Sequence, residues 1–153
     1  MDGGGETNSY TSTLTEVTDG AWAGWSYYPG GDPFEDYAGP FYFRIDERGP
    51  VCAFMPEHRH MNGGRFMHGG CIMTFADFAI FVIARDALGD GPSVTATFNG
   101  EFVGGAVEGR IVECRGEVVK AARSMVFVRG LITQDGANVM SFSAVIKKTR
   151  PRG

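Results

Sequence analysis

The most distinctive feature of the sequence is a nearly unbroken apolar segment at residues 71–88, in which 14 of the 18 residues are apolar. The run Gly89-Asp90-Gly91-Pro92 follows it directly, and glycine and proline in these positions are typical of a helix end. Because apolar residues occupy nearly every side of the predicted helix, we expect it to be buried.

After Ser93 the chain changes to an alternation of apolar and polar residues, which is the period-two pattern of β-strands with one buried face. The Asp135-Gly136 dipeptide is a hairpin-turn sequence between two such stretches. The long strands defined most clearly by this pattern are residues 112–118, 125–134 and 138–147.

Two shorter strands are predicted before the helix, at residues 41–46 and 51–55, with a turn sequence at residues 48–50 between them. The chain therefore contains two short strands, one buried helix and about four long antiparallel strands. This order favours an α+β fold in which one curved antiparallel sheet wraps around one long buried helix.

The length of 153 residues, with 43% hydrophobic and 21% charged residues, is typical of one globular domain. We predict a single domain over residues 31–150. Residues 1–30 are predicted to form a flexible N-terminal tail, because the first part of this stretch is rich in Gly, Ser and Thr. An aromatic-rich segment, residues 22–43, is interpreted either as a cover over one edge of the core or as a wall of an apolar ligand pocket.

The net charge of −4, without a concentrated basic face, argues against nucleic-acid binding. The apolar segment is too short for a membrane span and contains an Asp, so we expect no membrane partner. The three cysteines are far apart and form no Cys-x-x-Cys pair, which argues against disulfides and a zinc site. Since the first residues also lack the pattern of a secretion signal, we expect a cytoplasmic protein.

Asp77 lies in the middle of the predicted helix, where a buried carboxylate is costly unless it finds hydrogen bonds, an opposite charge or a wet cleft. Two interpretations stay open. In the first, Asp77 is a structural carboxylate that bonds to the backbone or to Arg85, two turns further along the same face. In the second, Asp77 is a catalytic acid or base whose apolar surroundings tune its pKa.

The tripeptide His68-Gly69-Gly70 stands where the loop becomes the helix. Two glycines remove side chains from the helix N-terminus, so its unpaired N–H groups and the positive end of its dipole can face a bound group. Donors of this kind form oxyanion holes and contribute on the order of 3 kcal/mol each. The alternative is that the glycines only permit a tight turn or close packing.

The string from Asn62 to Asp77, NGGRFMHGGCIMTFAD, resembles the hotdog-fold acyl-CoA thioesterases, in particular the group typified by the phenylacetate-pathway thioesterase. The family pattern has Asn six residues before the His of His-Gly-Gly and Asp nine residues after it, and both spacings occur here. The likeness covers about residues 34–147. It implies a hotdog fold and hydrolysis of an acyl-CoA to the free acid and CoA, with CoA as part of the substrate and no other cofactor.

The resemblance also implies roles for individual residues. Asp77 would be the general base or nucleophile, and Gly69 would donate a backbone N–H to the thioester oxygen. Asn62 would orient the water or the carbonyl, His68 would hold the loop and hydrogen-bond near the carbonyl, and Thr95 would help to place the water. In the family these groups meet across a dimer interface, which implies a homodimer or a dimer of dimers, that is, a homotetramer.

A binding site for the CoA phosphates is implied at Lys120, Arg123 and Ser124, where the family often places basic residues beside a Gly-Arg-Ser/Thr turn. In this sequence Ala122 stands in place of that glycine. The position of the basic residues, rather than the full turn motif, therefore carries this part of the resemblance.

The sequence also has features that bear on functions other than a thioesterase. His58 and His60 have a spacing that could place two imidazoles on a metal, but further ligands are missing, so no metal site is expected. A non-catalytic acyl-binding hotdog protein and an acyl-thioester dehydratase or hydratase remain alternatives. The sequence lacks the Phe-Pro-Gly and Asp-x-Asn-Pro-x-His strings of those two enzyme groups and retains Asn62, Gly69 and Asp77.

Overall fold

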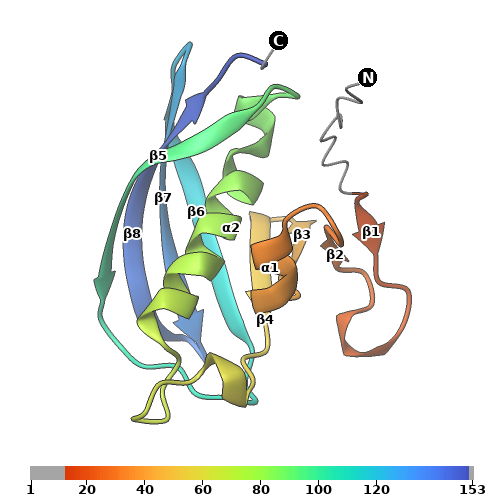
Figure 1. Cartoon of the computed structure of the whole chain (residues 1–153), viewed down its shortest axis with the longest axis vertical. Helices are drawn as coiled ribbons and strands as arrows, with labels where there is room; N and C mark the ends of the chain where they lie inside the picture. The colour runs from red at the N-terminus through yellow and green to blue at the C-terminus, as the bar shows by residue number, and fades with distance from the viewer. Residues whose placement is uncertain (1–12, 152–153) are drawn as a thin grey trace, which may run out of the picture.

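The computed structural model describes residues 13–151, in which one long helix, α2 (Gly69–Leu88), lies along one face of an eight-stranded antiparallel sheet (Figure 1). This is the α+β arrangement that the sequence predicts. In space the strands have the order β1-β2-β3-β4-β6-β7-β8-β5. They are β1 (Thr15–Glu16), β2 (Ser26–Tyr27), β3 (Tyr42–Asp46), β4 (Gly49–Phe54), β5 (Ser93–Phe102), β6 (Val112–Ala121), β7 (Met125–Gln134) and β8 (Ala137–Lys148).

Three short helical elements complete the described residues: η1 (Gly20–Trp22), α1 (Pro33–Ala38) and η2 (His58–His60). Of these, α1 lies beside α2, on the same side of the sheet and in front of β3 and β4 in the view of Figure 1. α1 begins at a strong helix start, because the carboxylate of Asp32 accepts from the N–H groups of Phe34 and Glu35 and proline occupies the first helical position.

The core lies between α2 and the sheet. Phe75, Ala79 and Ile80 of α2 are fully buried, and α2 packs mainly against β6 and β7. On β6, buried Val112 and Cys114 alternate with exposed residues, as the sequence pattern predicts for a strand with one face against a helix.

The boundaries of the main elements agree with the sequence pattern within a few residues. α2 begins at Gly69, two residues before the predicted start, because the side chain of His68 caps it, and it ends at Leu88 as predicted. The β7–β8 hairpin turns at Asp135 and Gly136, whose φ angles of 51° and 78° belong to the left-handed region that these residue types tolerate.

The N-terminal part of the described chain differs from the expectation of a flexible tail over residues 1–30. Residues 13–30 contain β1, η1 and β2, and β2 pairs with β3, so the sheet extends further than the sequence predicts. Trp25 anchors this segment, since it is only 8% exposed and packs with Val51 and Ala53 of β4. Residues 1–12 lie outside the described residues.

The aromatic-rich segment divides between two surfaces. Phe41 and Phe43 join the main core beside α2, whereas Trp22 and Trp25 pack on the opposite face of β4. These residues therefore cover the core and the sheet, as one interpretation of the sequence expected. Phe34 and Tyr37 of α1 are different, because both rings are largely exposed.

The three cysteines are free thiols. Cys52 of β4 and Cys114 of β6 are opposite each other in the sheet, and burial raises the pKa of both thiols. Within residues 13–151 no helix is both long and apolar enough to cross a membrane.

Candidate active site

The N-terminus of α2 presents two backbone donors, the N–H groups of Gly69 and Cys71, that have no partner within the described residues. His68 accepts a hydrogen bond at Nδ1 from the Gly70 N–H, at 2.9 Å, and so caps the helix. Gly69 occupies the first helical position, where an N–H has no partner within the helix. No acceptor for it occurs elsewhere in residues 13–151. The Gly69 N–H is therefore available at the positive end of the helix dipole.

The predicted oxyanion loop is held by Asn62. Its Oδ1 accepts from the N–H groups of Gly64, at 2.8 Å, and Phe66, at 3.2 Å. The backbone N–H of Asn62 also donates to the Phe66 carbonyl. The side-chain carbonyl thus shapes the loop, and its amino group makes no hydrogen bond within the described residues.

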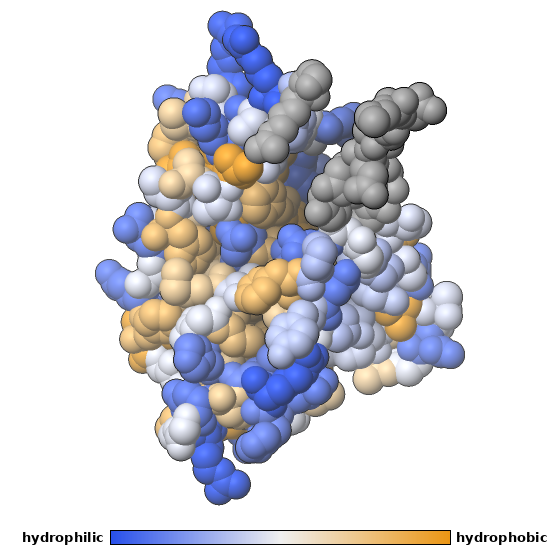
Figure 2. Space-filling model, in the orientation of Figure 1, coloured by the Kyte–Doolittle hydropathy of each residue, from blue (hydrophilic) through white to orange (hydrophobic). Residues whose placement is uncertain are grey.

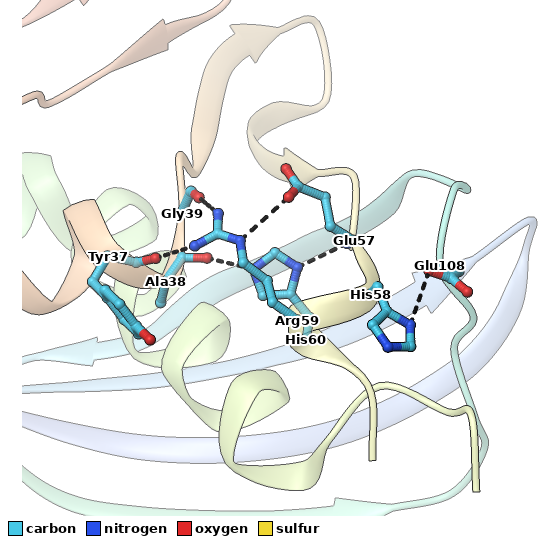
Figure 3. A network of polar contacts seen from close by, with 8 residues as sticks. All are labelled: Tyr37, Ala38, Gly39, Glu57, His58, Arg59, His60 and Glu108. Carbon is cyan, nitrogen blue, oxygen red and sulfur yellow. Dashed lines mark hydrogen bonds and ion pairs between the residues drawn. The ribbon is translucent and has the colours of Figure 1, made fainter. Parts of the chain in front are cut away.

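The loop is tied to α1 through η2. The His68 N–H donates to the carbonyl of His60, at 2.8 Å, which connects the helix cap directly to η2. The side chains of Arg59 and His60 in turn point toward the last carbonyls of α1 and its cap (Figure 3). Arg59 donates to the carbonyls of Tyr37 and Gly39. The end of α1 and the start of α2 are therefore parts of one hydrogen-bonded network.

His60 is a structural histidine. Its Nε2 donates to the Ala38 carbonyl, at 2.7 Å, its Nδ1 accepts from the Glu57 N–H, at 2.8 Å, and its ring is only 5% exposed (Figure 3). Both ring nitrogens are thus engaged with the backbone and unavailable to a metal. His58 is exposed and lies 3.8 Å from Glu108. Among the described residues there is no cluster of three side chains that could ligate a metal ion.

Asp77 is half-buried and is held by Thr95. The Thr95 hydroxyl donates to Asp77 Oδ1 at 2.6 Å, joining α2 to β5. Arg85 does not pair with Asp77, because its guanidinium lies over the ring of Phe43, 5.6 Å from the centroid. The first interpretation of Asp77 included an ion pair with Arg85. That ion pair is absent from the described residues.

A cavity of about 410 Å³ lies beside the Asp77 carboxylate. Phe78, Phe81 and Val82 form apolar walls, and besides Asp77 two further carboxyls line the cavity, those of Glu35 and Asp32. A separate cavity of about 310 Å³ contains His68 and Gly70, together with the exposed rings of Phe34 and Tyr37. The two cavities lie along α2 on either side of α1.

The predicted catalytic residues thus fall into two groups in one chain. Asn62, His68 and Gly69 are together at the start of α2, and Asp77 and Thr95 are together further along it. Eight residues of helix separate Gly69 from Asp77, or about 12 Å at 1.5 Å per residue. One protomer therefore does not bring the Asp77 carboxylate to the Gly69 N–H.

Lys120, Arg123 and Ser124 form a third group at the β6–β7 turn. All three are exposed, and the Ser124 carbonyl accepts from the Lys148 N–H at 2.8 Å. Register across β7 and β8 connects this turn to the start of β5, where Thr95 lies. The three residues are therefore at the end of the sheet that carries Thr95.

Two residues near these groups were not predicted from the sequence. The Phe102 ring covers Gly69, so that a side chain at Gly69 would meet it at 3.3 Å. Glu35 faces the Asp77 cavity, and burial together with the charges of Asp32, Asp77 and Asp36 raises its pKa to about 7. The sequence Asp32-Pro33 signals a helix start, but no local pattern places that helix against α2.

Comparison with known families identifies a family that matches this chain. Residues 64–141, just over half of the chain, match the family model described as the Thioesterase superfamily. The chain belongs to this superfamily. The matched range contains Gly69, Asp77 and Thr95, and Asn62 lies two residues before it. A search of curated proteins finds no significant match.

Solved structures confirm the hotdog fold of this superfamily member. The phenylacetic acid degradation protein PaaI from Thermus thermophilus, solved as a mutant, is 22% identical, with a TM-score of 0.67 over 77% of this chain and 100% of that chain. Conserved protein PA5202 from Pseudomonas aeruginosa is 18% identical, with a TM-score of 0.70 over 77% and 94%. A hypothetical thioesterase from Streptococcus pneumoniae TIGR4, solved with coenzyme A, is 20% identical, with a TM-score of 0.63 over 74% and 88%.

Proposed function

We propose that this protein is an acyl-CoA thioesterase that hydrolyses its substrate to a free acid and CoA. The observation that carries the proposal is the pair of groups on α2: a carboxylate, Asp77, held by Thr95, and an unpaired N–H at Gly69. They occur in a chain of the thioesterase superfamily. The coenzyme A in the solved S. pneumoniae structure of the same fold supports CoA as the carrier.

The proposed chemistry needs one base and one oxyanion donor. Asp77 takes a proton from water that attacks the thioester carbonyl, or attacks the carbonyl itself to give an anhydride that water then hydrolyses. The Gly69 N–H donates to the oxygen that becomes negative in the tetrahedral intermediate. The leaving group is a thiolate, whose parent thiol has a pKa of about 8.5 in the case of cysteine, so the C–S bond breaks more readily than an amide C–N bond.

The other residues of the site have supporting roles in this proposal. Thr95 fixes the Asp77 carboxylate toward the water, as its 2.6 Å hydrogen bond supports. His68 caps α2 and keeps the Gly70 N–H occupied, so that a carbonyl oxygen is directed to Gly69. The Asn62 amino group donates to the water or to the carbonyl.

A complete site in this proposal contains two copies of the chain, because about 12 Å of helix separates the Gly69 N–H from Asp77 within one copy. The free edge strand β5 supports a dimer, since Val94 is 51% and Phe102 is 53% exposed there. An unpaired apolar edge favours pairing with a second chain. Apolar side chains also gather over β5 and α2, whereas the side of β1 and β2 is mostly polar (Figure 2). We therefore propose a two-fold dimer through β5, alone or as half of a tetramer.

The CoA phosphates are assigned to the β6–β7 turn. Lys120 and Arg123 supply positive charge there and Ser124 a hydroxyl, at the end of the sheet where Thr95 lies. Because the Gly-Arg-Ser/Thr turn is incomplete, the phosphates are held by these side chains rather than by a glycine backbone. The proposed reaction uses CoA only as part of the substrate and requires neither a metal nor another cofactor.

The direct test is thiol release from a panel of aryl and fatty acyl-CoA esters. We expect the wild type to hydrolyse at least one ester and Asp77→Ala to be slower by about two orders of magnitude or more, a loss of roughly 3 kcal/mol of transition-state stabilisation. A folded Asp77→Ala protein with full activity would exclude Asp77 as the base. A wild type that binds acyl-CoA without hydrolysing any ester would identify an acyl-binding protein instead.

A second pair of variants isolates the oxyanion donor. Gly69→Pro removes the N–H, and proline is well tolerated at the first position of a helix after an extended residue such as His68, whose ψ is 136°. Gly69→Ala adds a Cβ against the Phe102 ring but keeps the N–H. We expect Gly69→Pro to lose about a hundredfold more kcat than Gly69→Ala. Equal activities would show that this N–H does not bind the oxyanion.

A further inference from the structure

Glu35 is a carboxyl that the proposed mechanism does not use. It lies in the first turn of α1 and is half-buried, and its carboxyl group makes no hydrogen bond within the described residues. It lines the cavity that also contains Asp77 and a second cavity, of about 170 Å³, on its other side. A carboxyl held against the cavity of the proposed base is placed to act on the same substrate.

The groups that face Glu35 are acids or weak acids. Asp32 and Asp36 come from α1 and its cap, and Asp77 comes from α2. The phenols of Tyr27 and Tyr28 line the same cavities from β2 and its end, and the Cys52 thiol of β4 is near enough to be affected by the Glu35 charge. Within the described residues no Lys, Arg or His lines either cavity. Glu35 therefore has no cation to hold it ionised.

Three carboxyls line the cavity; Asp32 caps α1, and the other two, Asp77 and Glu35, have different environments. The Thr95 hydroxyl donates to Asp77 at 2.6 Å, so Asp77 has a hydrogen-bond donor that Glu35 lacks. Glu35 has burial and three neighbouring negative charges, which raise its pKa to about 7. When two carboxyls of one site differ in this way, the first serves as the base and the second as the acid.

A purely structural role for Glu35 does not explain why its carboxyl is half-buried among other acidic groups. A carboxylate in the first turn of a helix stabilises the helix when it is ionised. Asp36 meets that description, since it is exposed and accepts from the Gly30 N–H with both oxygens. Glu35 is instead half-buried beside the carboxyls of Asp32 and Asp77, where ionisation is costly.

We propose that Glu35 is a second catalytic carboxyl, the acid that gives its proton to the departing thiolate while Asp77 acts as the base. The inference rests on the proposed thioesterase function and adds a residue to it. Both carboxyls come from the same protomer, and the oxyanion donor comes from the other.

The proton transfers balance over one cycle. Asp77 takes a proton from water as the water oxygen bonds to the carbonyl carbon. When the tetrahedral intermediate collapses, the C–S bond breaks with its electron pair on sulfur, and the Glu35 proton goes to that sulfur. The products are the acid and the thiol. The proton on Asp77 then passes to the Glu35 carboxylate, which restores the starting state.

The test compares Glu35→Gln with the wild type on two esters of the same acid, one with CoA and one with thiophenol. Thiophenolate is a weaker base than the CoA thiolate and leaves more readily without a proton. We expect Glu35→Gln to lower kcat/KM at pH 6.5 for the CoA ester by about tenfold more than for the thiophenyl ester. Asp86→Asn, at an exposed position of α2 away from the cavity, is the control and should change neither.

A pH profile gives an independent readout. Because the acid form of Glu35 is required, wild-type kcat/KM should fall above about pH 7, and Glu35→Gln should lose this alkaline limb. Glu35→Asp, which keeps a carboxyl, should retain it and shows whether a defect of the glutamine variant comes from misfolding.

The outcomes separate this inference from the function on which it rests. An active wild type whose Glu35→Gln variant has the same pH profile and the same ratio of the two esters would overturn the acid role and leave the thioesterase function standing. A wild type inactive on every thioester would overturn the function first, and the acid role with it.

Discussion

At the scale of single residues, one hydrogen bond connects the helix to the strand in the proposed site, from the Thr95 hydroxyl to Asp77. We expect Thr95→Val, which keeps the shape but removes the donor, to lower kcat about tenfold or more, because a hydrogen bond to a charged group contributes about 1.5–3 kcal/mol. Thr95→Ser keeps the hydroxyl and should stay within a few-fold of the wild type. Steady-state kinetics on the preferred acyl-CoA decides this, and a Thr95→Val enzyme as active as the serine variant would contradict it.

Glu35 also has a consequence for stability that does not depend on catalysis. Its pKa is about 7 in the folded protein against an ordinary value of 4.5, so between these pH values the folded state binds more protons than the unfolded state. Stability therefore falls as pH rises through this window. Glu35→Gln removes the ionisable group, so its free energy of unfolding relative to wild type should rise by roughly 1–2 kcal/mol from pH 4.5 to pH 8, after allowance for solvent screening of a half-buried group.

Urea unfolding of both proteins at the two pH values measures this difference. The exposed Asp86→Asn variant serves again as the control and should run parallel to the wild type. A constant difference between Glu35→Gln and wild type across this range would show that Glu35 ionises normally.

The sequence indicates the Asp77 and Gly69 groups but not Glu35, for a physical reason. Asp77 is conspicuous because it interrupts an apolar helix, and Gly69 because it stands at that helix's start. Glu35 is one of several acidic residues in the aromatic-rich segment 22–43, and only the packing of α1 against α2 places it beside the cavity that Asp77 lines. The role proposed for Glu35 depends on tertiary contacts, which a local sequence pattern does not show.

At the scale of elements, α1 is a short helix whose position depends on side chains from another segment. Arg59 bridges two carbonyls at its C-terminal end, and the His60 ring takes a third (Figure 3). A planar guanidinium suits this fork, whereas a lysine or an amide does not. The orientation of Phe34 and Tyr37 over the cavity beside His68 therefore depends on η2.

We expect Arg59→Gln to loosen α1 while the rest of the fold persists. Hydrogen exchange of the Gly39 amide, which bonds to the Glu35 carbonyl, should accelerate by about tenfold or more, since charged hydrogen bonds are lost. Arg110→Gln removes a single exposed ion pair with Asp135 and is the matched control, expected to leave this amide unchanged. Equal exchange in both variants would show that Arg59 does not hold α1.

The elements that the sequence predicts well are those that contribute many residues to the core. The long strands β6, β7 and β8 show the alternation of a strand with one buried face, and α2 stands out as a nearly unbroken apolar segment. β1 and β2 are two residues each, too short for any period, and they form through side chains such as Trp25 that pack on β4. The antiparallel sheet around one buried helix was therefore predictable from the pattern, the hotdog fold followed from the family resemblance, and the N-terminal extension of the sheet was not predicted.

At the scale of the whole molecule, the proposed site divides between two chains, and this division can be tested by complementation. Asp77→Ala retains the oxyanion donor, and Gly69→Pro retains the base. Mixing the two inactive variants with subunit exchange should restore about a quarter of the wild-type sites, because half of the dimers are mixed and each contains one intact site.

Thiol release before and after exchange measures the recovery, and a mass measurement in solution accompanies it. Two copies of the same variant, treated in the same way, provide the background. A mixture that stays inactive although mixed dimers form would place both groups in one protomer, and a strictly monomeric protein would exclude the shared site.

The position of β5 has a consequence for the order in which the protein can be assembled. Within residues 13–151 β5 pairs only with β8, although it is synthesised before β6, β7 and β8. During synthesis β5 therefore has no partner strand until β8 has emerged from the ribosome. The outer edge of β5 is fixed only then. The dimer that we propose through β5 can therefore form only after β8 has been synthesised, and a truncation within β8 would remove the support for that interface as well as one strand of the sheet.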